Sequence, residues 1–178
     1  MSNTLKIDTF KSKLSGGGAR PSLFEVFLGT QINLPDPEMS IMVKAAQLPA
    51  SIISPIPVPF RGRQLPVAGD RTFEPWTITV INDNNFMLRN AFEEWSNKVQ
   101  EHVSGQGTLT PADYMTDMWV KQLDRREESV KTYHFTGVWC SNISAIDLSY
   151  DAENTIEEFT VELQVTYWYA ADSTDIPG

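Results

Sequence analysis

Few side chains in this sequence could carry out covalent chemistry. The single cysteine, Cys140, follows His134 by six positions on one expected strand. That even spacing would place both side chains on one side of the strand, but roughly 20 Å apart. A nucleophilic Ser or Cys needs a histidine within hydrogen-bond reach and a third group that orients it. We therefore interpret both as ordinary sheet residues, and we assign no catalytic residue.

The other reactive or ligating groups are equally scattered. Carboxylates occur in pairs at Glu93–Glu94, Glu127–Glu128 and Glu157–Glu158, but each pair lies in a polar stretch, which indicates a solvated face. His102, near the end of an expected helix, suits the helix dipole. One cysteine and two histidines are too few ligands for a structural zinc site, and Gly16–Gly18 lacks the strand and helix that flank a phosphate-binding loop. We predict no metal site, no cofactor and no enzymatic activity.

The composition limits the kind of partner. The 178 residues carry 14 Lys and Arg against 23 Asp and Glu, a formal net charge of −9, which argues against a protein that grips nucleic acid through a basic surface. A hydrophobic fraction of 41% suits a globular domain. No apolar run is long enough to span a bilayer, and the first residues do not resemble a secretory signal. We expect a soluble protein, made in a reducing cytoplasm, with no membrane partner.

The charge is unevenly distributed along the chain. Residues 1–71 hold eight Lys and Arg against five Asp and Glu, whereas residues 72–178 hold six against eighteen. Two explanations of this uneven charge are open. One is chance combined with a need for solubility, and the other is an acidic surface on one side of the fold.

Hydrophobic periodicity predicts a mainly β protein with one helix. The expected strands cover residues 22–28, 39–47, 76–81, 118–125, 130–139 and 155–169, with 141–150 as a further option. The helix is expected over about 84–101, where one apolar stripe is formed by Leu88, Ala91, Phe92, Trp95 and Val99. This pattern favours an antiparallel β-sandwich or barrel with the helix packed on it. We expect a flexible tail over 1–18, with a hinge at Ser15–Gly18, and a single domain over 19–178.

The expected strand 155–169 has one apolar and one polar face. Alternation places on the apolar face Phe159, Val161, Leu163, Val165 and Tyr167. It places on the polar face Thr160, Glu162, Gln164 and Thr166. The same alternation gives strand 76–81 a polar face with Thr77 and Thr79. The polar faces meet either bulk solvent or the inside of a larger barrel.

The segment 49–66 is proline-rich yet apolar. Its prolines remove backbone donors, so it cannot be a central strand along its length. Its hydrophobic side chains need a surface to cover, either the core of the same chain or a neighbouring subunit. In the second case we expect apolar anchors and charged partners at Ile53, Ile56, Phe60, Arg61, Arg63 and Arg71.

Six stretches together resemble a known family. They are Ala19–Phe24, Lys44–Pro49, Val67–Phe73, Trp76–Val80, Phe92–Trp95 and Glu158–Trp168. In this order they resemble the tail tube proteins of contractile-tailed bacteriophages of the T-even type, and the likeness covers about residues 19–169. The stretch before Ala19 and the turn around Pro35–Glu38 look longer than the usual pattern of that family.

The resemblance implies a structural virion protein. Members form homohexameric rings that stack into an inner tail tube, and their sheets join around each ring into a continuous β-barrel whose lumen conducts DNA into the host. The implied partners are the contractile sheath, the baseplate and the tail terminator, with phage DNA passing without specific binding. The lumen-lining residues would be Thr77, Thr79, Thr160, Glu162, Gln164 and Thr166.

Two other functions use the same or a similar fold. The tubes of type VI secretion systems and of headless contractile injection particles pass proteins or toxins. The second alternative is a small β-sandwich binding module that acts alone. The combination of Val67–Phe73 with Trp76–Val80 favours the phage tube.

Overall fold

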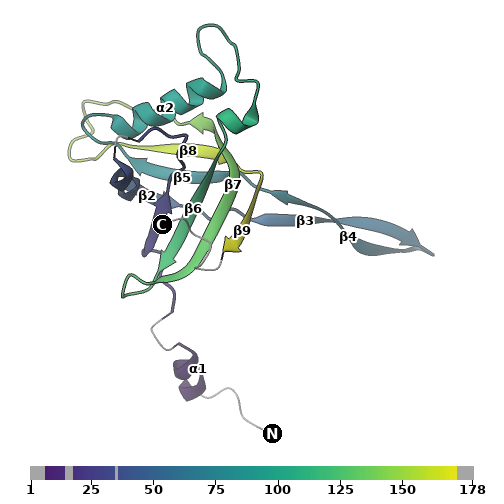
Figure 1. Cartoon of the computed structure of the whole chain (residues 1–178). Helices are drawn as coiled ribbons and strands as arrows, with labels where there is room; N and C mark the ends of the chain where they lie inside the picture. The colour runs from purple at the N-terminus through teal and green to yellow at the C-terminus, as the bar shows by residue number, and fades with distance from the viewer. Residues whose placement is uncertain (1–6, 15–17, 35, 172–178) are drawn as a thin grey trace.

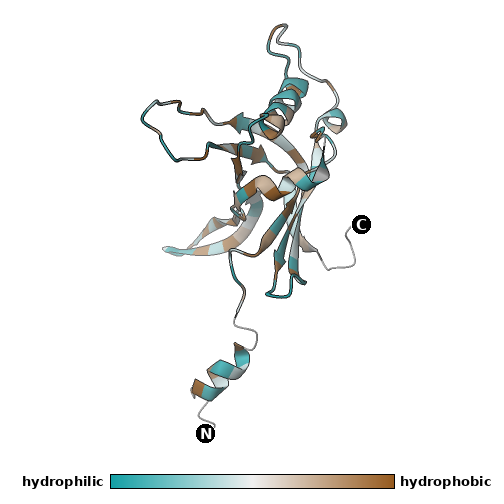
Figure 2. Ribbon diagram, turned by 90° about the vertical axis from the view of Figure 1, so that its left-hand side faces the viewer, coloured by the Kyte–Doolittle hydropathy of each residue, from teal (hydrophilic) through white to brown (hydrophobic). Residues whose placement is uncertain are grey.

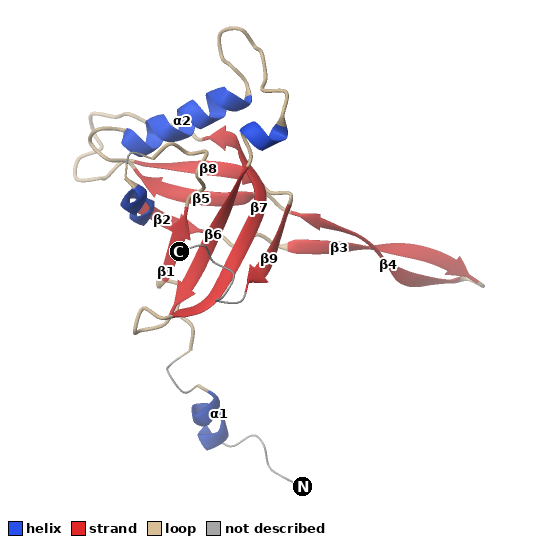
Figure 3. Cartoon of the chain, in the orientation of Figure 1, coloured by secondary structure: helices blue, strands red, loops and turns tan. Residues whose placement is uncertain are grey.

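The chain folds into a bent antiparallel sheet, a helix that covers it and a long two-stranded arm (Figures 1 and 3). A computed structural model describes residues 7–14, 18–34 and 36–171. Its helical elements are α1 (Ile7–Lys13), η1 (Pro37–Met42), α2 (Met87–Val99) and η2 (Pro111–Asp113). Its strands are β1 (Phe24–Phe27), β2 (Val43–Ala46), β3 (Ser51–Phe60), β4 (Arg63–Phe73), β5 (Trp76–Ile81), β6 (Thr116–Leu123), β7 (Ser129–Ile143), β8 (Glu158–Gln164) and β9 (Tyr167–Ala171). Among these described residues, no helix has the length and apolarity to cross a membrane.

One long strand, β7, belongs to both halves of the main sheet. The strand order is β1-β6-β7-β8-β5-β2, and β9 also pairs with β7. The first half of β7 pairs with β9 over residues 132–136, and the second half pairs with β8 over residues 139–143. Between these halves lies Gly137, whose φ of 63° favours glycine. A Cβ there would lie 2.4 Å from Thr166 Oγ1, so the bend has no room for a side chain.

The bend closes the sheet over an apolar core. Trp76 from β5 stacks on Phe135 from β7, with ring centroids 4.3 Å apart, and both rings are fully buried. On β5 and β8 the buried side chains alternate with more exposed ones, as expected for strands with one covered face. The buried ones are Trp76, Ile78, Val80, Phe159, Val161 and Leu163.

Helix α2 covers the open side of this core. Its buried side chains are Leu88, Ala91, Phe92 and Trp95, so the predicted stripe is confirmed for these four, while Val99 is half-buried. The Asp83 carboxylate accepts the backbone N–H of Met87 at 2.9 Å and caps the first turn. Trp95 donates its indole N–H to the Tyr114 carbonyl at 2.7 Å, which ties the helix to the chain ahead of β6.

The expectation of a single helix is wrong. The seven-residue helix α1 lies in the segment that we expected to be a flexible tail. None of its side chains is buried, so it contributes nothing to the core whose periodicity guided the prediction. The expected hinge at Ser15–Gly18 lies outside the described residues except for Gly18.

Three expected strands differ from the observed ones. The strand expected at 39–47 is β2 alone, because Asp36 accepts the Glu38 N–H and starts the 3-10 helix η1 before it. The optional strand at 141–150 ends at Ile143, as the last part of β7. The strand expected at 155–169 is two strands, because it follows the bent edge of β7 and breaks opposite Gly137.

This break reverses the alternation of side chains. Trp168, instead of Tyr167, packs against the core after it, and Tyr167 is 44% exposed. A single alternating strand is therefore an incorrect description beyond Gln164. The apolar face is confirmed for Phe159, Val161 and Leu163, and Val165 is half-buried against the core.

We predict that Trp95→Ala destabilises the folded subunit by about 3–5 kcal/mol, because it leaves a cavity under α2 and removes the hydrogen bond to Tyr114. The free energy of unfolding of the monomer in urea measures this loss. Glu94→Ala, at the neighbouring exposed position, should change it by less than about 0.5 kcal/mol. A Trp95→Ala protein of unchanged stability that fails to assemble would instead place this face of α2 at a subunit interface.

Candidate assembly surfaces

The arm, β3 with β4 (Ser51–Phe73), projects from the body as a two-stranded ribbon (Figure 1). Every residue of β3 after Ser51 is exposed. At its base Phe73 packs edge-on against Trp168, with ring centroids 6.1 Å apart. The prediction that this segment is no central strand is confirmed, and the ribbon does not cover the core of its own chain.

The prolines restrict strand pairing at the outer edge of β3. Pro57 lies opposite Pro66, and because neither has an N–H, this pair occupies a non-hydrogen-bonded position. Pro55 and Pro59 lie two residues away, so they share that position with N directed away from β4. The outer edge of β3 therefore lacks donors where a third strand would need them. This edge of the arm can therefore contact other surfaces mainly through its side chains.

The arm also has one aliphatic face. Opposite residues on paired strands share a face, and the register places Ile56 with Val67 and Val58 with Leu65. Phe60 extends this face near the tip and is 67% exposed. This run of exposed apolar side chains makes the arm a candidate contact surface.

The arm also carries three arginines. Arg61 and Gly62 form the tip with φ values of 45° and 79°, the pattern of a tight hairpin turn. The Arg61 guanidinium lies 5.3 Å from the Phe60 ring centroid. Arg63 lies opposite Phe60 and shares its face, whereas Arg71 lies opposite Ile53, and alternation along β3 places that pair on the other face of the arm. With Asp70 as its one acidic residue, the arm is basic in a chain of net charge −9.

The second surface is a polar wall on the outside of β5, β7 and β8. Thr77 pairs with Glu162 and Thr79 with Thr160, on the face opposite the buried side chains. The Ser141 hydroxyl donates to the Glu162 carbonyl at 3.0 Å and accepts the Gln164 amide at 3.4 Å. We call these residues the polar wall: Thr77, Thr79, Ser141, Thr160, Glu162 and Gln164. The expected residues other than Thr166 thus lie on one face, and their place in a lumen stays a prediction.

Thr166 and Lys44 modify the predicted face. Thr166 lies in the break after β8 and donates its hydroxyl to the Gly137 carbonyl at 3.3 Å. Lys44 on β2 lies at the edge of the wall, where its ammonium is 2.5 Å from the Glu158 carboxylate. Sequence reasoning missed this cation because β2 and β8 are brought together only through β5. Its charge is paired with Glu158.

The structure explains why the cysteine is not a nucleophile. Cys140 is 3% exposed, and burial raises the pKa of its thiol to about 11. His134 lies in the other half of β7, with Nδ1 2.6 Å from the Tyr169 hydroxyl and Nε2 3.3 Å from the Asp117 carboxylate. Among the described residues, no group of His, Cys, Asp and Glu is arranged to hold a metal ion.

Comparison with known proteins identifies the family. Residues 19–171 match the family described as phage tail tube protein. The chain belongs to this family. It is 37% identical over 166 residues to the tail tube protein gp19 of Enterobacteria phage T4, across 90% of this chain and 97% of that protein. It is 29% identical over 127 residues to the tail tube protein of Serratia phage KSP90, across 71% of this chain and 72% of that protein.

Solved structures with lower identity share the fold. A chain in the baseplate of the anti-feeding prophage superposes with a TM-score of 0.64 at 16% identity, covering 86% of this chain and 95% of that one. A chain in the sheath-tube complex of the PVC extracellular contractile injection system superposes with a TM-score of 0.59 at 12% identity, covering 90% of this chain and 96% of that one.

The family match and the identity to phage tail tube proteins confirm the predicted family. The chain is a structural tail tube protein of contractile-tailed phages and a component of the virion, and it is not an enzyme.

We predict that the Cys140 thiol reacts slowly with a thiol reagent at pH 8 in the folded protein and rapidly after unfolding. A Ser141→Cys variant should add one fast equivalent, because that position is exposed. Since burial raises the folded pKa above 9.0, the unfolded thiol ionises first. The protonated thiol therefore contributes to the free energy of unfolding in full below pH 9, and this contribution is lost as the pH rises towards about 11. Equal reaction rates at positions 140 and 141 would contradict this assignment.

Proposed function

We propose that this tail tube protein assembles into hexameric rings that stack into the inner tube of the tail, with the arm crossing a subunit boundary. The observation that carries the proposal is the exposed aliphatic face of the arm, formed by Ile56, Val58 and Phe60 with their partners on β4. Fully burying one such side chain contributes roughly 1.5–3 kcal/mol. Repeated at each contact in a tube, this is a strong driving force.

The edges of the main sheet support ring closure. Within the described residues, β2 ends the strand order with no partner on its outer side, and β9 pairs on one side only, with β7. Unpaired edges with free backbone groups are sites where another chain can add strands. Pairing between neighbouring subunits would extend the sheet around the ring into one barrel.

In such a barrel the polar wall faces the lumen. The opposite face of β5 and β8 covers the core, so the wall is the face left to line a channel. The channel surface would then present hydroxyls, an amide and a ring of Glu162 carboxylates, with Lys44 paired to Glu158. Phosphates would meet like charge, so DNA would pass without specific binding. Thr166 would lie at the border of this surface.

The outside of the tube has the remaining partners. We infer contacts with a contractile sheath, a baseplate and a tail terminator, with assembly in the host cytoplasm. Support comes from the related chains, which were solved in a baseplate and in a sheath-tube complex. The sequence identity to phage tail tube proteins favours the phage tail over a secretion or injection tube.

We predict that replacing Ile53, Ile56 and Phe60 together by Ser gives a folded monomer that no longer forms tubes. All three are exposed in the single chain, so the substitution spares the core. Negative-stain electron microscopy reports tubes, and circular dichroism reports folding. The matched control Ile53→Val, Ile56→Val, Phe60→Leu keeps the arm apolar and should still assemble.

A companion variant tests the arginines. Arg61→Glu, Arg63→Glu and Arg71→Glu together should weaken assembly in a manner that depends on salt, if they pair with acidic residues of the next subunit. For the triple serine variant at positions 53, 56 and 60, two results would contradict the role proposed for the arm: tubes that form normally, or a monomer that does not fold.

We predict that Glu162→Lys with Thr160→Lys permits assembly but slows genome ejection. The added cations would hold phosphates in the lumen, and the delay should shrink at high salt. Ejection is followed by dye binding to released DNA after particles are triggered. The control pair Glu162→Gln with Thr160→Gln removes charge without adding cations and should eject at a normal rate. Normal ejection from the lysine variant would place this face on the outer side of the tube.

A further inference from the structure

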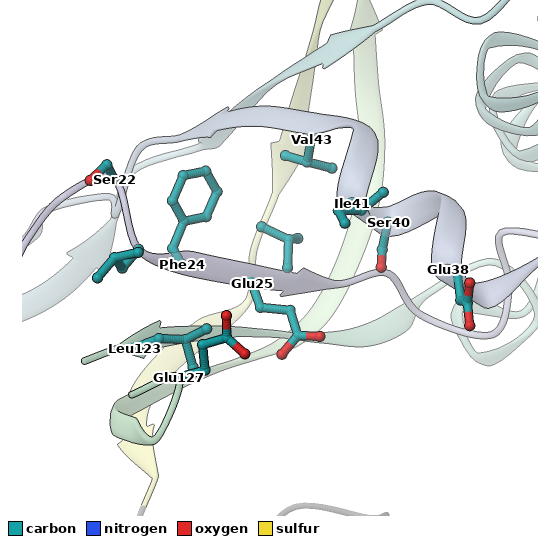
Figure 4. A pocket seen from close by; sticks show the side chains of 11 residues that line it. Ser22, Phe24, Glu25, Glu38, Ser40, Ile41, Val43, Leu123 and Glu127 are labelled. Carbon is teal, nitrogen blue, oxygen red and sulfur yellow. The ribbon is translucent and has the colours of Figure 1, made fainter. Parts of the chain in front are cut away.

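A groove lies beside the outer edge of β1, between that strand and η1 (Figure 4). Its volume is about 550 Å³, within the range of cavities that hold a ligand. Phe24 and Val43 form apolar walls on one side of the strand, and Leu123 lies on the other. Ile41 from η1 also lines the groove and is 85% exposed, so the groove presents an uncovered apolar surface.

The rim of the groove is acidic. Glu25 and Glu127 lie together on one side and Glu38 at the end of η1, and no Lys, Arg or His lines the groove. None of these three carboxylates forms an ion pair with a residue that the structure describes. An occupant would therefore combine an apolar stripe with positive charges beside it.

Helix α1 of the same sequence has these properties. Ile7, Phe10 and the adjoining Leu14 recur at intervals of three and four, so they form one stripe on the helix. They are 68%, 65% and 43% exposed. Lys11 and Lys13 flank this stripe at the helical angles on either side. Figure 2 shows α1 apart from the body, with hydrophobic and hydrophilic residues together on it.

The helix needs a partner for physical reasons. Helices shorter than roughly 12–15 residues are marginal in water, and α1 has seven. It lies beyond the end of the body, so it leaves the groove of its own chain empty (Figure 1). It also precedes the segment 19–171 that matches the family.

We propose that α1 of one subunit docks in the groove of a neighbouring copy, with Phe10 in contact with Ile41. Lys11 and Lys13 then face Glu25, Glu38 and Glu127. The occupant is a second copy because the helix points away from its own body while the complementary stripe and charges are present in every chain. This inference rests on the proposed assembly and adds to it a second link between subunits, separate from the arm.

Disulfide trapping in the full-length protein tests this docking. Phe10→Cys and Ile41→Cys are made in separate chains that carry different tags, mixed, and oxidised mildly. Cys140 stays in place because it is buried. We expect a disulfide-linked heterodimer at least several times more abundant than with Val103→Cys, a 96% exposed position elsewhere, in place of Ile41→Cys. A chain with both Phe10→Cys and Ile41→Cys should give linked multimers.

Charge exchange gives a second readout. Glu25→Lys with Glu38→Lys, on the Ile41→Cys chain, should lower the yield of heterodimer several-fold. Lys11→Glu with Lys13→Glu, on the Phe10→Cys chain, should restore it, because the pairs are then reversed.

The outcomes separate this inference from the proposed tube. Tubes of unmodified protein without the heterodimer, or a double-cysteine chain that closes only on itself, would overturn the docking and leave the tube proposal intact. The heterodimer without tubes would support the docking and contradict the tube. The absence of both would overturn both.

Discussion

The bend of β7 at Gly137 is the constraint on which the rest of the fold depends. The Gly137 backbone N–H donates to Asp117 Oδ1 at 3.0 Å, and Thr166 occupies the space that a side chain at position 137 would need. The bend turns the two halves of the sheet towards each other, which brings Trp76 onto Phe135. A straight β7 would leave these rings on a flat, open face. Helix α2 could then cover only part of it.

Closing the core in this way decides which faces remain outside. On β5 and β8 the apolar side chains are buried in the core, so hydroxyls, an amide and carboxylates form the polar wall on the opposite face. The arm projects from the body, and the prolines of β3 prevent a third strand from joining that edge of the arm. Its aliphatic side chains are therefore left for contacts beyond the chain. The same core thus produces a polar surface and an apolar one, at separate places.

Much of this could be predicted from the sequence, and the misses have physical reasons. Regular alternation revealed β5 and most of β8, and the stripe around Phe92 and Trp95 revealed α2. The break after Gln164 could not be seen in the strand itself, because its cause is Gly137 on a neighbouring strand. Lys44 was missed on the polar wall for a similar reason, since its ion pair joins residues 114 positions apart. Helix α1 has no buried side chain, so no core pattern marked it.

Assembly of this protein must overcome the repulsion between chains of net charge −9. At physiological salt that repulsion acts over roughly 8 Å, so it is weak between surfaces that are not in contact. Contacts must then be stabilised locally, by apolar burial with opposite charges beside it. Both proposed links have this form: the arm joins aliphatic side chains to three arginines, and α1 joins its stripe to two lysines. These two projecting parts hold five of the 14 basic residues but only two of the 23 acidic ones, so the acidic excess lies on the rest of the chain. This distribution accounts for the uneven charge of the sequence without a nucleic-acid-binding surface, since each cation cluster accompanies an apolar surface that needs a protein partner.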